Sequence, residues 1–414
     1  MAEPILTQKF DNGLVLLGES IPTAESAAFT IRVPAGSIFE PGNRNGLSAV
    51  TCELAQRGAG ARDSRQFVTD LDNLGVERDA SVSDAHTSFS GATLARNLLP
   101  ALQIYGDVLR RARLPEDQFE AARAVCLQDV SSIEDDPAQK VMLELRRLHF
   151  PDPWGRCSQG DQAALEAVTL DEIRAHVHHR YRPNGTIIGV AGRFDWKTVV
   201  DQVGQLYGDW AVQPDEKFQE ITNGKQREHL HHESNQTQIG IAYKSVPYKD
   251  PDYFQAWGAV GVLSGGMSSR LFTEVREKRG LCYTVYATHQ SLRDMGSVLC
   301  YAGTSSERAQ ETLDVTLGEL VRLANGIEPN ELKRLKARIK SALVMQQEST
   351  SARSAALARD WYYLGRVRTL EEVGSLVDAL TCESINNYLA AHPPADFTIV
   401  TLGSEPLEVP VAVS

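Results

Sequence analysis

Arg276 and Tyr283 are the pair of residues in this sequence best suited to chemistry. The charged stretch around Arg276 predicts a helix that ends near Gly280, and a strand with alternating aromatic residues follows. Across such a corner both side chains can donate a hydrogen bond to one carbonyl or oxyanion. From spacing alone, the pattern also fits a basic helix end on the surface followed by a core strand, and this arrangement is the more common one.

Other familiar chemical motifs are missing from the chain. It has no GxxxxGK[ST] loop, no GxGxxG after a strand and no GxSxG elbow. The loop that begins with Gly265 and Gly266 lacks the lysine that a P-loop needs. Two histidine groups, at 176–179 and 229–232, offer imidazoles for a metal. The first group is also expected simply because a helix C-terminus favours such residues.

Composition narrows the class of protein. The 414 residues carry 42 Lys and Arg against 54 Asp and Glu, so the formal net charge is −12, which argues against nucleic-acid binding. No apolar run reaches the roughly 18 residues of a membrane span, and the first residues do not resemble a signal peptide. The six cysteines form no CxxC pair, as expected for reduced thiols. We therefore expect a cytoplasmic protein without membrane insertion.

The order of predicted elements divides the chain into two similar halves. A stretch at 213–228 with Pro, Gly and many charges predicts a linker between domains 1–212 and 229–414. Each half has strands, helices, more strands, further helices and a last strand, an order that suggests internal duplication. Strands mixed with long amphipathic helices predict an α+β or α/β fold.

Individual helices have clear local signals. Thr169 and Glu172 have the spacing of a capping box, and Thr369 and Glu372 repeat it in the second half. The 3–4 residue spacing of one apolar series predicts a single buried helix face, made of Leu332, Leu335, Ile339, Ala342 and Leu343.

The stretch 265–286 closely resembles the second-half signature of the M16 family, which includes pitrilysin, insulinase and mitochondrial processing peptidase. Phe10-Asp-Asn-Gly13 resembles the family's first strand, and 180–192 resembles the end of its first half. The segments 348–353 and 363–366 resemble its late helices. The resemblance implies an α+β fold of two homologous domains, each an antiparallel sheet backed by helices, that together form half of a clamshell.

The zinc motif of the family is altered in this chain. Active members carry HxxEH on a helix, where two histidines bind zinc and the glutamate activates water. The matching positions here hold Ala49, Cys52 and Glu53, and Asp129 matches the distal ligand. Alanine cannot bind a metal, and Glu53 with Asp129 makes at best a weak hard-cation site. The resemblance therefore implies that this chain binds no zinc cofactor and has no metallopeptidase activity alone.

Arg276 and Tyr283 match the pair with which the family's second domain touches the substrate near the scissile bond. The resemblance thus implies a zinc-less subunit that binds peptide and supplies this pair in trans to an HxxEH-bearing M16 partner, as a heterodimer or a dimer of heterodimers. Gly265 and Gly266 are candidates for a substrate-guiding loop or for a simple tight turn.

The sequence is also compatible with two other functions. The first is a structural M16-like subunit without a peptidase role, similar to the core proteins of respiratory complexes. The second is an enzyme that acts alone at a site remodelled around Cys52, Glu53 and Asp129, with His86 as the candidate base. The retained Arg276 and Tyr283 favour the subunit that supplies them in trans.

Overall fold

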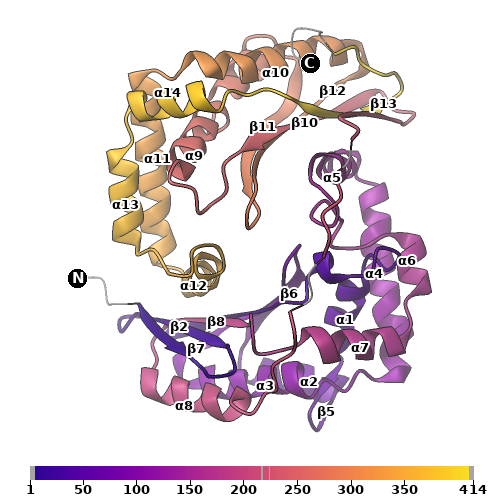
Figure 1. The fold of residues 1–414 in the computed structure, drawn as a ribbon, viewed down its shortest axis with the longest axis vertical. Coiled ribbons are helices and arrows are strands. Elements are labelled where there is room, and N and C mark those ends of the chain that lie inside the picture. The colour runs from indigo at the N-terminus through magenta and orange to yellow at the C-terminus, as the bar shows by residue number, and fades with distance from the viewer. Residues whose placement is uncertain (1–4, 216–217, 223, 410–414) are drawn as a thin grey trace. The chain divides into compact units, whose positions relative to one another are not determined.

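The computed structural model describes residues 5–215, 218–222 and 224–409, so positions 216, 217 and 223 of the expected linker lie outside the described residues. The chain separates into two compact units, each with one large sheet backed by helices (Figure 1). Unit 1 comprises 1–132, 152–221 and 345–369, and unit 2 comprises 133–151, 222–344 and 370–414. The α+β class expected from the sequence is confirmed.

Unit 1 contains a six-stranded sheet in the order β1-β2-β8-β3-β7-β6. Its strands are β1 (Leu6–Lys9), β2 (Val15–Ser20), β3 (Ser26–Val33), β6 (Glu77–Val82), β7 (Thr87–Leu94) and β8 (Ile187–Gly192). A small hairpin, β4 (Gly58–Ala59) with β5 (Arg62–Asp63), forms a separate two-stranded sheet. One pair, β2 with β8, is parallel, and the other neighbours are antiparallel.

Unit 2 contains a five-stranded sheet in the order β11-β12-β10-β13-β9. Its strands are β9 (Arg227–His231), β10 (Gln236–Ser245), β11 (Cys282–Ser291), β12 (Gly296–Ser305) and β13 (Thr398–Gly403). Here β13 pairs in parallel with β9, and the remaining pairs are antiparallel.

The two sheets have the same topology. The strand order β2-β8-β3-β7-β6 of unit 1 corresponds, strand by strand, to the order β9-β13-β10-β12-β11 of unit 2. In both orders the first pair of strands is parallel and the other three pairs are antiparallel. The two homologous domains inferred from the element order are therefore visible in the strand connections. Each sheet is antiparallel, as expected, except for one parallel pair. This pair forms because the last strand of each half inserts next to an early strand after a long crossover.

Helices cover each sheet and bury its apolar face. Unit 1 has α1 (Leu47–Ala55), α2 (Ser64–Asn73), α3 (Leu98–Arg110), α4 (Phe119–Glu134), α6 (Gln162–Ala167), α7 (Leu170–Arg180) and α8 (Trp196–Tyr207). Unit 2 has α9 (Tyr253–Leu263), α10 (Ala309–Arg322), α11 (Pro329–Gln347), α13 (Leu370–Ala379) and α14 (Cys382–Ala391). The capping box of Thr169 and Glu172 at the start of α7 is confirmed.

The buried face predicted for α11 is correct at its centre and wrong at one position. Leu335 and Ile339 are buried, while Leu332 and Leu343 pack partly against the core. Ala342 is exposed. The buried stripe follows the four-residue steps from 335 to 339 and 343, and position 342 lies about 100° around the helix from 343.

Each unit includes one helix from the other half of the sequence. Helix α12 (Thr350–Leu364) packs against β3 and β8 in unit 1, whereas α5 (Pro137–His149) packs against β10 and β13 in unit 2. The approach of α12 is close, because a Cβ atom at Gly189 would lie 2.3 Å from the Ser354 carbonyl oxygen. The hydroxyls of Thr30 and Ser354 are 3.0 Å apart and form a buried hydrogen bond. Each sheet is therefore covered in part by a helix that comes from the other half of the sequence.

Candidate functional site

The structure brings Arg276 and Tyr283 into contact in unit 2. The guanidinium carbon of Arg276 lies 4.8 Å from the ring centroid of Tyr283 and 4.8 Å from that of Phe272. Arg276 belongs to a π-helix, Phe272–Glu277, in which the Lys278 N–H donates to the Thr273 carbonyl at 3.0 Å. Such wide turns are uncommon and often lie at functional sites. Arg276 is held between two rings, with its charge directed at their faces.

Tyr283 projects from the sheet because of a β-bulge. On β11, Cys282 pairs with Thr304 and Thr284 with Gly303, so Tyr283 is the extra residue between two paired neighbours. A bulge turns a side chain away from the regular alternation of a strand. Tyr283 is 82% exposed, although Cys282 beside it is buried. Its hydroxyl is therefore available to a ligand.

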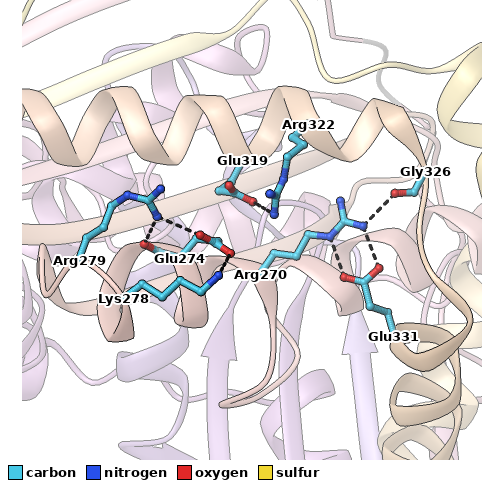
Figure 2. A network of polar contacts seen from close by, with 8 residues as sticks. All are labelled: Arg270, Glu274, Lys278, Arg279, Glu319, Arg322, Gly326 and Glu331. Atoms are coloured by element: carbon cyan, nitrogen blue, oxygen red, sulfur yellow. Dashed lines mark hydrogen bonds and ion pairs between the residues drawn. The ribbon is translucent and has the colours of Figure 1, made fainter.

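A polar network anchors the helix that carries Arg276 (Figure 2). Arg270 forms a two-point ion pair with Glu331 of α11, with both N–O distances 2.8 Å, and donates to the Gly326 carbonyl at 2.9 Å. Glu274 accepts from Lys278 at 2.7 Å and from Arg279 at 2.9 Å. These two hydrogen bonds lower the pKa of Glu274, so the network stays ionised. The network fixes both ends of the π-helix.

The loop with Gly265 and Gly266 has a structural explanation. A Cβ atom at Gly265 would lie 2.1 Å from the Gly261 carbonyl oxygen and 2.4 Å from the Arg338 guanidinium. Gly266 has a φ of +153°, which other residues rarely adopt. Packing and backbone conformation thus require both glycines without reference to a substrate.

The four degenerate zinc-motif positions line one pocket of about 250 Å³ in unit 1. Ala49, Cys52 and Glu53 come from α1, and Asp129 comes from α4. The rest of the lining is formed by Gln56, Ala80, Ser81, Val82, Val125, Cys126, Ser158 and Gln159. The spacing of the motif on one helix places Ala49, Cys52 and Glu53 close together. Asp129 joins them from α4.

The donors in this pocket do not fit a zinc ion. Ala49 has no donor atom, and the Glu53 carboxylate is paired with the Arg57 guanidinium at 2.8 Å. Among the described residues, no group of three or more His, Cys, Asp or Glu side chains is placed to hold a metal. A guanidinium beside the carboxylate repels a cation, so no catalytic step is assigned to a metal on this chain.

The pocket also lacks the features of a thiol enzyme. Burial strongly raises the pKa of the Cys52 thiol, and the Glu53 carboxylate raises it further. Burial likewise raises the pKa of Cys126 to about 12. Within the described part of the chain no histidine lines the pocket, and the ring of His86 lies instead 4.4 Å from that of Tyr362. Neither thiol has the lowered pKa that a nucleophilic cysteine needs.

Helix α1, which carries the degenerate motif, begins at a buried carboxyl group. The Glu40 side chain accepts from the N–H of Gly46 at 2.9 Å and from that of Ser48 at 2.7 Å. These contacts satisfy two of the N–H groups that a helix start leaves unpaired. Burial nevertheless raises the pKa of Glu40 from 4.5 to about 7, although both backbone hydrogen bonds oppose the shift.

The raised pKa of Glu40 predicts a pH-dependent stability. The folded state holds this proton more tightly than the unfolded state, so its contribution is complete below pH 4.5 and is lost as the pH rises through 7. Glu40→Gln is expected to remove a decline on the order of 2–3 kcal/mol. Urea unfolding of both proteins from pH 5 to 7.5 measures the difference, with the exposed Glu116→Gln as control. A constant difference across this range would show that Glu40 does not titrate there.

Several contacts around the candidate site were not predicted from the sequence. The spacing of Glu53 and Arg57, four residues apart on a helix, already permits their ion pair. Phe272 likewise stands four residues before Arg276 and could have been identified as its ring partner. The bulge at Tyr283 has no such local signal, because it depends on the register with β12.

Comparisons with known proteins agree with this geometry. Residues 15–150 match the family described as insulinase (peptidase family M16), and residues 167–339 match the peptidase M16 inactive domain. A Bacillus subtilis protein named uncharacterized zinc protease YmxG is 26% identical over 387 residues, which cover 91% of this chain and 92% of its own length. A Mycobacterium tuberculosis protein, also named an uncharacterized zinc protease, is 27% identical over 383 residues, with 90% and 87% covered.

Solved structures show the same fold. The peptidase M16 inactive domain from Pseudomonas fluorescens has a TM-score of 0.89 at 21% identity and covers 99% of this chain and 100% of its own. A chain of complex III2 from Candida albicans has a TM-score of 0.81 at 18% identity, and the match covers 97% of this chain and 96% of that one.

In the described residues no helix has the length and apolarity to cross a membrane. On the strength of both sequence matches, this chain belongs to peptidase family M16.

Proposed function

We propose that this chain is the zinc-less subunit of a heteromeric M16 metalloendopeptidase. It binds peptide and presents Arg276 and Tyr283 to the active site of a partner chain that carries HxxEH and zinc. The observation that carries the proposal is the contrast between the two sites. The former zinc pocket holds an Arg57–Glu53 ion pair, whereas Arg276 and Tyr283 are held together and Tyr283 is exposed.

An unpaired sheet edge supports peptide binding. Among the described strands β6 is the last one of its sheet, and all of its residues are exposed or half-buried. The free N–H and C=O groups of such an edge can pair with an extended peptide. Ala80, Ser81 and Val82 of this strand also line the pocket. A peptide added to β6 would therefore lie along the remodelled zinc site.

The roles of Arg276 and Tyr283 in this proposal are electrostatic. The Arg276 guanidinium stabilises a substrate carbonyl or the negative charge that develops on it, and the Tyr283 hydroxyl donates a hydrogen bond to the same oxygen. Zinc in the partner would supply the Lewis acid and the activated water. The π-helix network holds Arg276 in place before the substrate arrives, so little reorganisation is needed.

The native assembly tests the proposal. The endogenous chain, tagged and purified gently from its own cells, is expected to carry a stoichiometric companion of similar size with HxxEH and about one zinc per pair. The pair is expected in the cytoplasm. A monomer or homodimer without zinc would contradict the proposal.

A second candidate is a structural M16-like subunit without a peptidase role. The likeness to a chain of complex III2 favours it, although that likeness concerns the fold alone. In the same purification, recovery within a large membrane assembly would support this alternative. The exposed Tyr283 favours the peptidase subunit, because a purely structural role does not require it.

A further inference from the structure

Arg32 in unit 1 is a half-buried arginine with one donor atom that has no partner in the described part of the chain. It lies on β3 between buried residues, and its Nε atom is buried without a hydrogen-bond partner among the described residues. Burial is the largest influence on its pKa and lowers it, and the positive charge of Arg359 on α12 lowers it further. Tyr363 opposes this lowering more strongly than Arg359 adds to it, and Tyr362 and Asp84 oppose it more weakly. A buried donor without a hydrogen-bond partner is unfavourable, which points to a binding role for Arg32.

The sheet register connects Arg32 to the pocket. Arg32 pairs with Ser88 of β7, and Ser88 pairs with Ser81 of β6. Directly paired residues project to the same face of a sheet, so these three side chains form one row. Two strand spacings, about 10 Å, separate the backbone of Arg32 from that of Ser81. Ser81 lines the pocket beside the β6 edge.

The side chains around Arg32 suit an anion. Tyr362 and Tyr363, on the same helix as Arg359, are close enough to influence the pKa of Arg32. Helix α12 is fixed over this face by the hydrogen bond between Thr30 and Ser354 at 3.0 Å. The row from Ser81 through Ser88 to Arg32 bears only small hydroxyl side chains before it reaches the guanidinium.

We propose that Arg32 is a carboxylate-binding subsite that selects peptides with an acidic side chain or a free C-terminus on the segment that leaves the β6 edge. The guanidinium fork matches a carboxylate with two parallel hydrogen bonds. This inference rests on the proposed peptide binding and names its preferred substrate class. Arg32 acts in it as a specificity-determining residue, separate from Arg276 and Tyr283.

A stability measurement separates a binding role from a structural one. Because the buried Nε atom of Arg32 has no hydrogen-bond partner among the described residues, Arg32→Leu is expected to unfold at the same temperature as the wild type or at a higher one. An arginine that held the fold together would instead give a lower unfolding temperature on removal. The matched control is Arg174→Leu, which removes one charge from an exposed side of α7. A clear loss of stability in Arg32→Leu alone would overturn the proposal.

Binding of defined peptides tests the specificity itself. The probes are fluorescein-labelled nine-residue Thr/Val peptides with an amidated C-terminus and one Glu scanned along the chain, each with a Gln counterpart. A further pair of Thr/Val peptides contains no Glu or Gln, and its two members differ only in having a free acid or an amide at the C-terminus. Fluorescence anisotropy is expected to show about 10- to 100-fold tighter binding of one Glu peptide, or of the free acid, to the wild type and to Arg174→Leu. Arg32→Leu should lose this preference.

The outcomes distinguish the two proposals. A preference for one Glu position identifies a side chain as the ligand, and a preference for the free acid identifies the C-terminus. If Gln and amidated peptides bind as tightly as their acidic counterparts, the subsite is wrong while peptide binding stands. If no peptide of either set binds, peptide binding by this chain is contradicted, and the subsite with it.

Discussion

Replacing Tyr283 by phenylalanine is expected to lower peptide turnover by the assembled pair on the order of 10²–10³-fold, with a small change in KM. The reason is that Tyr283→Phe removes only the hydroxyl. The ring that lies 4.8 Å from the Arg276 guanidinium stays, so the geometry of the neighbouring arginine is preserved. Loss of one donor to a transition-state oxyanion costs a factor of this size. Single-turnover kinetics with a quenched peptide measures the chemical step directly.

Arg276→Ala and Arg276→Lys extend this test. The alanine variant removes the charge and releases both ring partners, so its loss should equal or exceed that of Tyr283→Phe. The lysine variant keeps the charge but lacks the planar fork, and an intermediate loss is expected.

Matched controls are available close by on the same two elements. Tyr286→Phe removes a hydroxyl three residues further along β11, and Glu277→Gln removes a charge from the exposed last residue of the same helix. Both are expected to keep turnover within about twofold. If Tyr283→Phe retains wild-type turnover while Tyr283→Ala loses it, the tyrosine only packs against Arg276, and its role as a donor in trans is wrong.

Local signals explain how much of the fold was predictable. The core strands and the capping box at Thr169 are encoded within a few residues, by alternation or by a fixed spacing, and the structure contains them. The pocket around Cys52 and Glu53 follows from helix periodicity, which places both residues on neighbouring faces of α1. Asp129 came from the resemblance alone, since nothing local ties α4 to α1.

The features that were not predicted depend on contacts distant in sequence. The bulge that exposes Tyr283 arises from its register with β12, and the row that links Arg32 to Ser81 arises from pairing among three strands. The parallel pair of β2 and β8 joins segments about 170 residues apart. Periodicity within one segment contains no information on such pairings.

The exchange of α5 and α12 has the largest consequence for stability. Fragments 1–221 and 222–414, expressed separately, are expected to aggregate or to unfold without a cooperative transition. Fragment 1–221 lacks α12, whose Leu357 and Ala358 pack in a buried cluster with Val15, Leu17 and Ile187. Fragment 222–414 lacks α5, which covers β10 and β13. The predicted boundaries at 212 and 229 divide the chain in the same way.

The expected size of the effect follows from the area re-exposed. Uncovering several fully buried aliphatic side chains costs roughly 1.5–3 kcal/mol each, so the loss approaches the whole stability of a typical domain. The ion pair between Arg353 and Glu19, at 2.6 Å and with Arg353 only 3% exposed, is lost as well. Glu19 would then remain on the uncovered sheet without its partner.

Two further experiments decide whether the missing helix is the cause. Co-expression of both fragments should restore a soluble complex with cooperative unfolding, because each helix can again reach its sheet. Joining residues 345–369 to fragment 1–221 through a long Gly/Ser linker should restore unit 1 alone, since the linker supplies reach without structure. Calorimetry and circular dichroism report both outcomes. If fragment 1–221 alone unfolds cooperatively near the temperature of the rescued unit, α12 contributes little, and the two halves of the sequence fold independently despite their exchanged helices.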